Sequence, residues 1–462
     1  MPSKKTPFSI SERKLLLRVF DAVFAIEGLA IVSFIFDFHY FNTINESIYK
    51  WMSILIVYLL LVGQIFEMYN LKIANDKYLV LRSAILTGIF TTLFYVFTPI
   101  VTPVLPVNRM QIVYLFLAIT ISIYVWRLAY IYFIFSPLFF NRILLIGSNK
   151  EDVFKLVELV KIKAPENFIV GYICPEEIMD TTIKRIDFEN ETLYNLVLTN
   201  HISEIVVDNF HKSVFTNNFT PQLISLFKKG YLITSSEKFI ESISKRIPET
   251  HLNESFYNHL TFSNSQQNRA YFIFHRVFDI IGALIGIMFL AFLIPFVLLT
   301  NSISNKGKIF YYQERVGKGG ELFKIIKLRT MVSNAEKSGA VWAIKNDVRI
   351  TKFGKFLRRT RFDEIPQFIN ILKGDMSIIG PRPERPQFVE ELSKNYPFYT
   401  IRNVIKPGLT GWAQVEYPYA STKEEQYVKL RYDLYYIKER NLLLDFKILI
   451  KTISTVLFLR GT

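Results

Sequence analysis

The sequence is poor in the residues that bind transition metals or form disulfides. Its 462 residues include one cysteine, Cys174, and six histidines. An intramolecular disulfide is therefore excluded, which fits a reducing, cytosol-facing location, and we expect Cys174 to be an inert, packed thiol. Because no histidines and cysteines have the spacing of metal ligands, zinc chemistry is not expected. The glycine motif of dinucleotide-binding folds is also missing, since Gly-Ser-Asn-Lys follows Ile146 in place of G-x-G-x-x-G.

Long apolar runs are abundant instead, in a chain with 50% hydrophobic and 15% aromatic residues. Four such runs, at about 19–38, 51–70, 83–104 and 110–135, are each long enough to cross a hydrocarbon core of about 30 Å. Basic residues before the first run place the N-terminus in the cytoplasm, and this charged start is too long for a cleaved signal peptide. We therefore predict a four-helix transmembrane domain over residues 1–140, from which the chain returns to the cytoplasm.

A fifth apolar run, at about 277–300, has basic residues on both sides. His275 and Arg276 precede it, and Lys306 and Lys308 follow, so both flanks favour the cytoplasm. Pro295 interrupts the run, and a proline removes one backbone hydrogen bond and bends a helix. We predict a re-entrant helix that turns near Pro295 and leaves by the same membrane face; the alternative is a plain fifth span.

Residues 141–250 alternate between short strand-like and helical segments. Segments 142–147, 168–173 and 204–208 have the pattern of buried strands, separated by helical patterns. This order predicts a small parallel Rossmann-like α/β domain. Because the glycine motif is missing, a scaffolding or regulatory role is favoured over dinucleotide binding. Residues 251–270, rich in Asn, Ser and Gln, are typical of a linker.

Positive charge is concentrated in the last third of the chain. Residues 301–462 contain 29 Lys and Arg against 16 Asp and Glu, which accounts for most of the net charge of +15. A basic domain beside membrane segments favours anionic lipid head groups or phosphorylated substrates. Nucleic acid is not expected as a partner, because no nucleic-acid motif is present.

The segment 306–331 predicts a β-hairpin with a glycine-rich turn. Lys327 and Arg329 lie two residues apart on the returning strand, so they share one face. Two cations on one face could grip a diphosphate, and the arginine fork suits bidentate contacts with phosphate oxygens.

Two adjacent carboxylates, Asp363 and Glu364, follow a cluster of cations that comprises Lys355, Arg358, Arg359 and Arg361. Nearby positive charge favours an ionised carboxylate, and an ionised aspartate beside bound phosphate can attack phosphorus. Pro366 predicts that the pair lies at the start of a helix. Neighbours on a helix point about 100° apart, which favours one acid for attack and one for metal or proton handling. Mg²⁺ is the hard cation that suits carboxylate and phosphate oxygens.

Three further segments complete this domain. The stiff turn at 380–383 presents Arg382. Trp412 is interpreted either as a packing residue or as a base contact. The segment 432–454 predicts an amphipathic helix, which is more typical of a membrane interface than of a span.

Together these motifs resemble the bacterial sugar transferase family, the polyprenyl-phosphate glycosyl-1-phosphate transferases. The matching pieces are YYQERVGKGGELFKIIKLRTM, DVRITKFGKFLRRTRFDEIPQ, KGDMSIIGPRPERP, KPGLTGWAQV and YDLYYIKERNLLLDFKILIKT. The layout is similar to the long membrane branch of that family. The resemblance implies a multi-domain protein of the bacterial inner membrane, in which residues 271–462 form a re-entrant helix and a small, mostly α catalytic domain that faces the cytoplasm.

The resemblance also implies roles for particular residues. Asp363 would be the nucleophile and Glu364 its partner, with Mg²⁺ held by both on the substrate diphosphate. Phosphate charge would be neutralised by Lys327, Arg329, Arg358 and Arg382, and Pro383 would shape the turn near the uridine. Asp363 would attack the sugar-bearing phosphorus of a UDP-sugar and release UMP. Undecaprenyl phosphate would then take the phosphosugar, which is the first membrane step of exopolysaccharide, capsule or O-antigen synthesis. The identity of the sugar stays open, and homodimerisation through the middle domain is expected.

Two departures and two alternatives accompany this hypothesis. Glu416-Tyr417-Pro418-Tyr419 stands where many members have Asn-Gly-Arg, so contacts of that loop are not carried over, and Arg361 stands where a small residue is common. A membrane-bound nucleotide-sugar dehydratase is the second enzyme class, against which the missing glycine motif and the lack of a Tyr-x-x-x-Lys dyad argue. A non-catalytic scaffold of a polysaccharide assembly complex is the third hypothesis, and it predicts that Asp363 is replaceable.

Overall fold

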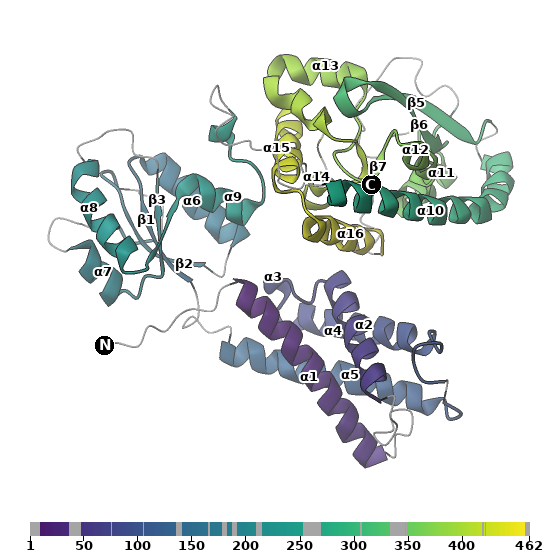
Figure 1. The fold of residues 1–462 in the computed structure, drawn as a ribbon, viewed down its shortest axis with the longest axis horizontal. Coiled ribbons are helices and arrows are strands. Elements are labelled where there is room, and N and C mark those ends of the chain that lie inside the picture. The colour runs from purple at the N-terminus through teal and green to yellow at the C-terminus, as the bar shows by residue number, and fades with distance from the viewer. Residues whose placement is uncertain are drawn as a thin grey trace. The chain divides into compact units, whose positions relative to one another are not determined.

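The computed structural model describes residues 10–36, 48–74, 76–104, 106–134, 141–164, 167–177, 183–186, 192–208, 215–252, 269–304, 307–332, 347, 349–417, 420 and 422–457. The chain divides into two compact units, Met1–Ser244 and Lys245–Thr462. The first contains an apolar helical bundle and a parallel sheet, and the second contains the basic part of the chain (Figure 1).

A long helix occupies most of each of the four apolar runs predicted in the first unit. The long helices are α1 (Ile10–Phe36), α2 (Ile48–Ile65), α4 (Lys77–Val96) and α5 (Met110–Ala129), with the short α3 (Leu71–Ala74) between α2 and α4. In the described part of the chain, five helices are long and apolar enough to cross a membrane, and α10 is the fifth. The chain is therefore a membrane protein; the direction of each crossing stays a prediction.

A buried ion pair ties the bundle together. Arg127 on α5 donates from Nε and Nη2 to the two carboxylate oxygens of Asp21 on α1, at 2.9 and 2.5 Å. Its Nη1 donates to the carbonyl of Met68 at 2.8 Å, in the turn that precedes α3. Both charged side chains are almost fully buried. Each charge compensates the other in a place where an unpaired ion would be very costly.

The predicted Rossmann-like domain is a parallel four-stranded sheet in the order β2-β1-β3-β4. Its strands are β1 (Asn141–Ile146), β2 (Asn167–Ile173), β3 (Glu204–Val207) and β4 (Leu232–Ser235). Its helices are α6 (Lys150–Lys163), α7 (Leu193–Thr199), α8 (Phe215–Lys228) and α9 (Ser236–Ser244). Separate apolar clusters include Val157 with Phe239 and Leu196 with Phe219, so helices cover both faces of the sheet. Cys174 is buried directly after β2, as predicted.

The second unit begins earlier than the sequence suggested. Ile247 is buried in its main core, and Trp412 Nε1 donates to the carbonyl of Lys245 at 2.9 Å. The linker predicted at 251–270 falls mainly on 253–268, which lies outside the described residues.

The second unit combines one long helix with a hairpin and short helices. Its first elements are α10 (Arg269–Ser304), the antiparallel hairpin β5 (Phe310–Val316) and β6 (Leu322–Leu328), α11 (Lys352–Thr360), α12 (Gln367–Lys373) and β7 (Ser377–Ile379). Then follow α13 (Pro386–Asn395), the 3₁₀ segment Pro397–Val404, β8 (Gly408–Thr410), which pairs in parallel with β7, α14 (Trp412–Glu416), α15 (Lys423–Glu439) and α16 (Leu442–Leu457).

One side of helix α10 carries glycines and packs closely on the rest of this unit, and the other side carries exposed apolar side chains. A Cβ at Gly286 would lie 2.2 Å from the ring of Phe368, so the close approach of the helix at this residue requires glycine, and a Cβ at Gly282 would lie 2.4 Å from Ile378 Cδ1. On the other side, Met288 and Phe292 are 74% and 82% exposed, as expected for lipid-facing residues.

The helix continues through Pro295 to Ser304, and its ribbon bends in its last part (Figure 1). A proline accounts for such a bend, since it removes a hydrogen bond of the helix. The return of the chain to the same membrane face stays a prediction.

Candidate active site

The two adjacent carboxylates lie on a tight turn between α11 and α12. Helix α11 ends at Thr360, and Arg361 adopts the left-handed conformation with φ of 62° and ψ of 14°. The 3₁₀ turn Phe362–Glu364 follows, and α12 starts only at Gln367. The sequence predicted a helix start, whereas the structure places the pair on this separate turn. The left-handed conformation costs a non-glycine residue about 1–2 kcal/mol, so the turn is held by its surroundings.

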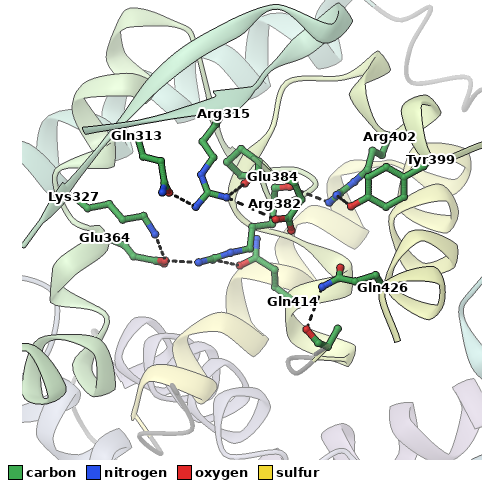
Figure 2. A network of polar contacts seen from close by, with 12 residues as sticks. Gln313, Arg315, Lys327, Glu364, Arg382, Glu384, Tyr399, Arg402, Gln414 and Gln426 are labelled. Carbon is green, nitrogen blue, oxygen red and sulfur yellow. Dashed lines mark hydrogen bonds and ion pairs between the residues drawn. The ribbon is translucent and has the colours of Figure 1, made fainter. Parts of the chain in front are cut away.

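Glu364 is the anchor of a cationic cluster. Its Oε1 accepts from Arg382 Nη2 at 2.8 Å and from Lys327 Nζ at 3.2 Å, and Arg361 Nη1 lies 3.6 Å from its Oε2 (Figure 2). Burial alone would raise the pKa of Glu364, but these cations outweigh burial and hold the pKa well below its usual range. Glu364 is therefore an anion near neutral pH.

Asp363 has the opposite surroundings, although it is the adjacent residue. Its side chain is 8% exposed and makes no hydrogen bond or ion pair with any residue that the structure describes. Burial, followed by the negative charge of Glu364, raises the pKa of Asp363 to about 6 against the pull of Lys327 and Arg358. The sequence had suggested that the basic cluster would favour its charged form; desolvation reverses that shift. At pH 7 the carboxylate is still ionised by roughly ten to one.

Neighbouring backbone is fixed around the cluster by buried side chains. Asn370 on α12 accepts from the backbone N–H of Ile326 at 3.1 Å and donates to the carbonyl of Lys324 at 2.8 Å, which holds β6 and Lys327 against the carboxylate turn. Arg402 Nη2 donates to the carbonyl of Arg382 at 2.9 Å and pairs with Asp433 at 2.8 Å. The backbone at or next to Lys327 and Arg382 is thus held by groups outside the cluster, whereas Glu364 positions their charged ends.

A cavity of about 380 Å³ opens onto both carboxylates. Nine Lys and Arg side chains and four Asp and Glu side chains are found among its described lining residues. An excess of cations around a concave site suits a ligand with several negative charges. The charged lining residues are Arg315, Lys327, Arg329, Asp347, Arg349, Arg358, Arg361, Asp363, Glu364, Arg382, Glu384, Arg385 and Lys429.

Most of the site residues predicted from the sequence meet at this cavity. Asp363, Glu364 and all four predicted phosphate ligands, Lys327, Arg329, Arg358 and Arg382, line it. Pro383 does not line it, but its carbonyl accepts from Arg315 Nη1 at 3.0 Å.

Three residues outside the predicted set lie elsewhere. Lys355 and Arg359 from the basic cluster are exposed and lie outside the lining. Trp412 is 1% exposed and belongs to the core, in agreement with the packing interpretation.

Several lining residues escaped the sequence analysis. Arg315 on β5 holds Gln313 Oε1 at 2.6 Å and lies 3.7 Å from Glu384 (Figure 2). Its alternation with Gln313 was a usable signal, because both lie on the same face of the hairpin as Lys327, which pairs with Tyr311. Lys429 on α15 gave no such signal, since a lysine in a charged helix is usually solvated.

These features define a class: a membrane protein whose C-terminal unit carries a cationic cavity with two buried, electrostatically distinct carboxylates. The model of the family described as Bacterial sugar transferase matches residues 270–459, which include all of the cavity lining.

The names of similar proteins agree with this match. The chain is 50% identical over 142 residues to the "Putative undecaprenyl-phosphate N-acetylgalactosaminyl 1-phosphate transferase" of Bacillus subtilis, covering 31% of this chain and 79% of that protein. It is 40% identical over 217 residues to the "UDP-N-acetylgalactosamine-undecaprenyl-phosphate N-acetylgalactosaminephosphotransferase" of Aeromonas hydrophila, covering 47% of this chain and 50% of that protein.

A third relative is the "UDP-glucose:undecaprenyl-phosphate glucose-1-phosphate transferase" of Xanthomonas campestris, 41% identical over 182 residues, or 39% of this chain and 38% of that protein. The chain belongs to the bacterial sugar transferase family. The match thus spans half or less of the Aeromonas and Xanthomonas proteins.

Proposed function

We propose that this protein transfers a sugar 1-phosphate from a UDP-sugar to undecaprenyl phosphate, with Asp363 as the nucleophile and UMP as the leaving group. The observation that carries the proposal is the contrast between the two carboxylates. Glu364 Oε1 is paired with two cations, whereas Asp363 has no partner among the described residues and lines the cationic cavity. The names of the relatives, which include undecaprenyl phosphate and UDP-sugars, support this choice of substrates.

In the first step an Asp363 carboxylate oxygen forms a bond to the sugar-bearing phosphorus. The bond from that phosphorus to the bridging oxygen breaks, its electron pair stays on the oxygen, and UMP leaves without needing a proton. Lys327, Arg329, Arg358 and Arg382 neutralise the charge that gathers on the phosphate oxygens. A pKa of about 6 leaves Asp363 ionised at pH 7 but more basic than an exposed aspartate, which suits a nucleophile.

In the second step a phosphate oxygen of undecaprenyl phosphate attacks the same phosphorus. The bond to Asp363 breaks, the carboxylate is restored, and a lipid-linked diphosphate sugar results. The lipid-facing side of α10 supports an acceptor that arrives from the bilayer, with the site at the cytoplasmic face of a bacterial inner membrane. The sugar stays open, because the relatives differ in it.

Mg²⁺ is part of the proposal, and the residues present fit it. Asp363 and Glu364 would hold the ion together with substrate phosphate oxygens. Asp363 has unused acceptor capacity within the described part of the chain, and Glu364 Oε2 has a single long contact, at 3.6 Å. When bound, a Mg²⁺ ion supplies positive charge to the diphosphate, and it commonly requires only one or two protein carboxylates.

Nucleotide release tests the proposal. Membranes with wild-type protein, Mg²⁺ and undecaprenyl phosphate are incubated with a panel of UDP-sugars, beside Asp363→Asn and the control Arg359→Gln, an exposed cation outside the cavity. We expect UMP from the wild type and the control and none from Asp363→Asn. Release of UDP would mean ordinary glycosyl transfer. Wild-type levels of product from Asp363→Asn would refute its role, and no release from any sugar would favour the scaffold hypothesis.

Two structural expectations are tested separately. For the re-entrant path, a single cysteine at Lys308 in a Cys174→Ser background should be labelled only from the cytoplasmic side, and periplasmic labelling would contradict it. Light scattering of the detergent-purified protein tests homodimerisation, and a monomer would argue against it.

A further inference from the structure

Lys429 is a cation of the cavity that the proposed reaction does not yet use. It lies on α15 and lines the same cavity as Asp363. Gln426 and Asp433, three residues before it and four residues after it, are on the same helix face and are buried. Gln426 also lines the cavity, and Asp433 pairs with Arg402. The face of α15 that carries Lys429 is therefore turned toward the site.

The ammonium group of Lys429 makes no hydrogen bond and no ion pair with the residues that the structure describes. The two carboxylates that attract it electrostatically each face an arginine, since Asp433 lies 2.8 Å from Arg402 and Glu384 lies 3.7 Å from Arg315. Burial lowers the pKa of Lys429, and the attraction of Glu384 only partly opposes burial. A partly desolvated ammonium without a paired anion is unfavourable. An anion that entered the cavity would therefore be stabilised by pairing with Lys429.

Lys429, Arg382 and the carboxylate pair all line the same cavity. In the view of Figure 2, Glu364 and Gln426 are on opposite sides of Arg382. Arg382 and Lys429 also share an electrostatic neighbour, the carboxylate of Glu384. For a diphosphate with one phosphate at Asp363 and Arg382, Lys429 is a cation of the same cavity that is available to the other phosphate.

We propose that Lys429 binds the nucleoside-side phosphate of the donor diphosphate and holds the nucleoside monophosphate as it leaves. The inference rests on the proposed function and deepens it. When the bond between the sugar-bearing phosphorus and the bridging oxygen breaks, the electron pair adds one negative charge to the nucleoside phosphate. Lys429 stays protonated and neutralises that charge, so no proton moves.

The test is equilibrium binding of UMP and of uridine to the full-length protein in detergent. Lys429→Met should bind UMP about 10- to 100-fold more weakly than the wild type, the range for a lost hydrogen bond to a charged group. Uridine, which lacks the phosphate, should bind equally to both. Lys429→Arg should restore most of the UMP affinity. Lys423→Met, on the same helix but outside the cavity, should behave as the wild type.

Unchanged UMP affinity in Lys429→Met, or no UMP binding by the wild type, would overturn the inference. An equal loss for UMP and uridine would also overturn it, because that pattern indicates a structural role. Steady-state kinetics add a second readout. Product inhibition by UMP should weaken in Lys429→Met, while the KM for undecaprenyl phosphate stays unchanged. Failure of the proposed function is a separate result, since it is defined by the absence of UMP release from every UDP-sugar.

Discussion

The contrast between the two carboxylates leads to a prediction about pH. Glu364→Gln removes the neighbouring charge that raises the pKa of Asp363 and frees Lys327 and Arg382 from their anion. Both changes favour the ionised form of Asp363, so its pKa should fall from about 6 toward the ordinary value of about 4. The pH at which the rate of the first step falls off on the acid side, the acid limb of the profile, should therefore move lower by up to about two units.

The magnitude follows from the ionised fraction. At pH 5 a group with a pKa of about 6 is roughly one-tenth ionised, whereas one with a pKa of about 4 is roughly nine-tenths ionised. Burial, the larger cause of the raised pKa, remains in the variant, so relative to its own plateau Glu364→Gln should be more active than the wild type at pH 5 by up to about tenfold. Its plateau itself should be lower, because Lys327 and Arg382 lose the anion that positions them.

The assay is the burst of UMP in a single turnover without undecaprenyl phosphate, from pH 4.5 to 8. Leaving out the lipid avoids its phosphate, since phosphate monoesters titrate near pH 6. Arg359→Gln serves as the control and should keep the wild-type limb. An acid limb at the same pH in Glu364→Gln and in the wild type, with both proteins folded, would refute the reasoning. So would a shift of the limb to higher pH.

Three further predictions concern stability. The pKa of Asp363 is higher in the folded protein than in the unfolded chain, so the contribution of this residue to stability falls as the pH rises from about 4 to 6 and stays unfavourable above that range. Asp363→Asn should therefore raise the free energy of unfolding by up to about 3 kcal/mol at pH 7 and by less at pH 5. An unchanged Tm in detergent at both pH values would contradict this. Gly354→Ala places a Cβ 2.0 Å from the carbonyl oxygen of Thr330 and should destabilise the second unit by about 1–3 kcal/mol in chemical unfolding. Lys355→Ala on the same helix should have little effect. Equal stability of the two variants would show that α11 can shift freely. Arg127→Met leaves Asp21 as a buried unpaired acid and should destabilise the helical bundle by about 3–5 kcal/mol. Adding Asp21→Leu should recover most of this loss, and an additive loss in the double variant, measured by the same unfolding assay, would refute the pairing.

Much of the architecture could be predicted because it depends on local patterns. The four apolar runs, the parallel strands after residue 141 and the glycine-rich hairpin were all found where periodicity and turn residues placed them. Asp363, Glu364 and Arg382 were candidates because a carboxylate pair and a stiff Pro-Arg-Pro turn are visible in the chain itself. Residue type and spacing were sufficient for these conclusions.

The roles within the site depended on tertiary structure. Sequence alone could not distinguish Asp363 from Glu364, because the difference lies in which of them contacts Lys327 and Arg382, residues 37 and 18 positions away from Glu364. The direction of the Asp363 pKa shift was wrong at first, since desolvation outweighs the attraction of nearby cations and desolvation is a property of the folded protein. Lys429 joined the cavity only through the packing of α15.

The sequence by itself therefore determined the class of fold, the membrane character and the residue types available for phosphate chemistry, because these follow from hydrophobic periodicity, turn chemistry and charge. Only the tertiary structure decided which carboxylate is paired, which is left without a partner and which cations reach the same cavity. The physical reason is that burial and electrostatic interaction depend on distances between residues far apart in the chain.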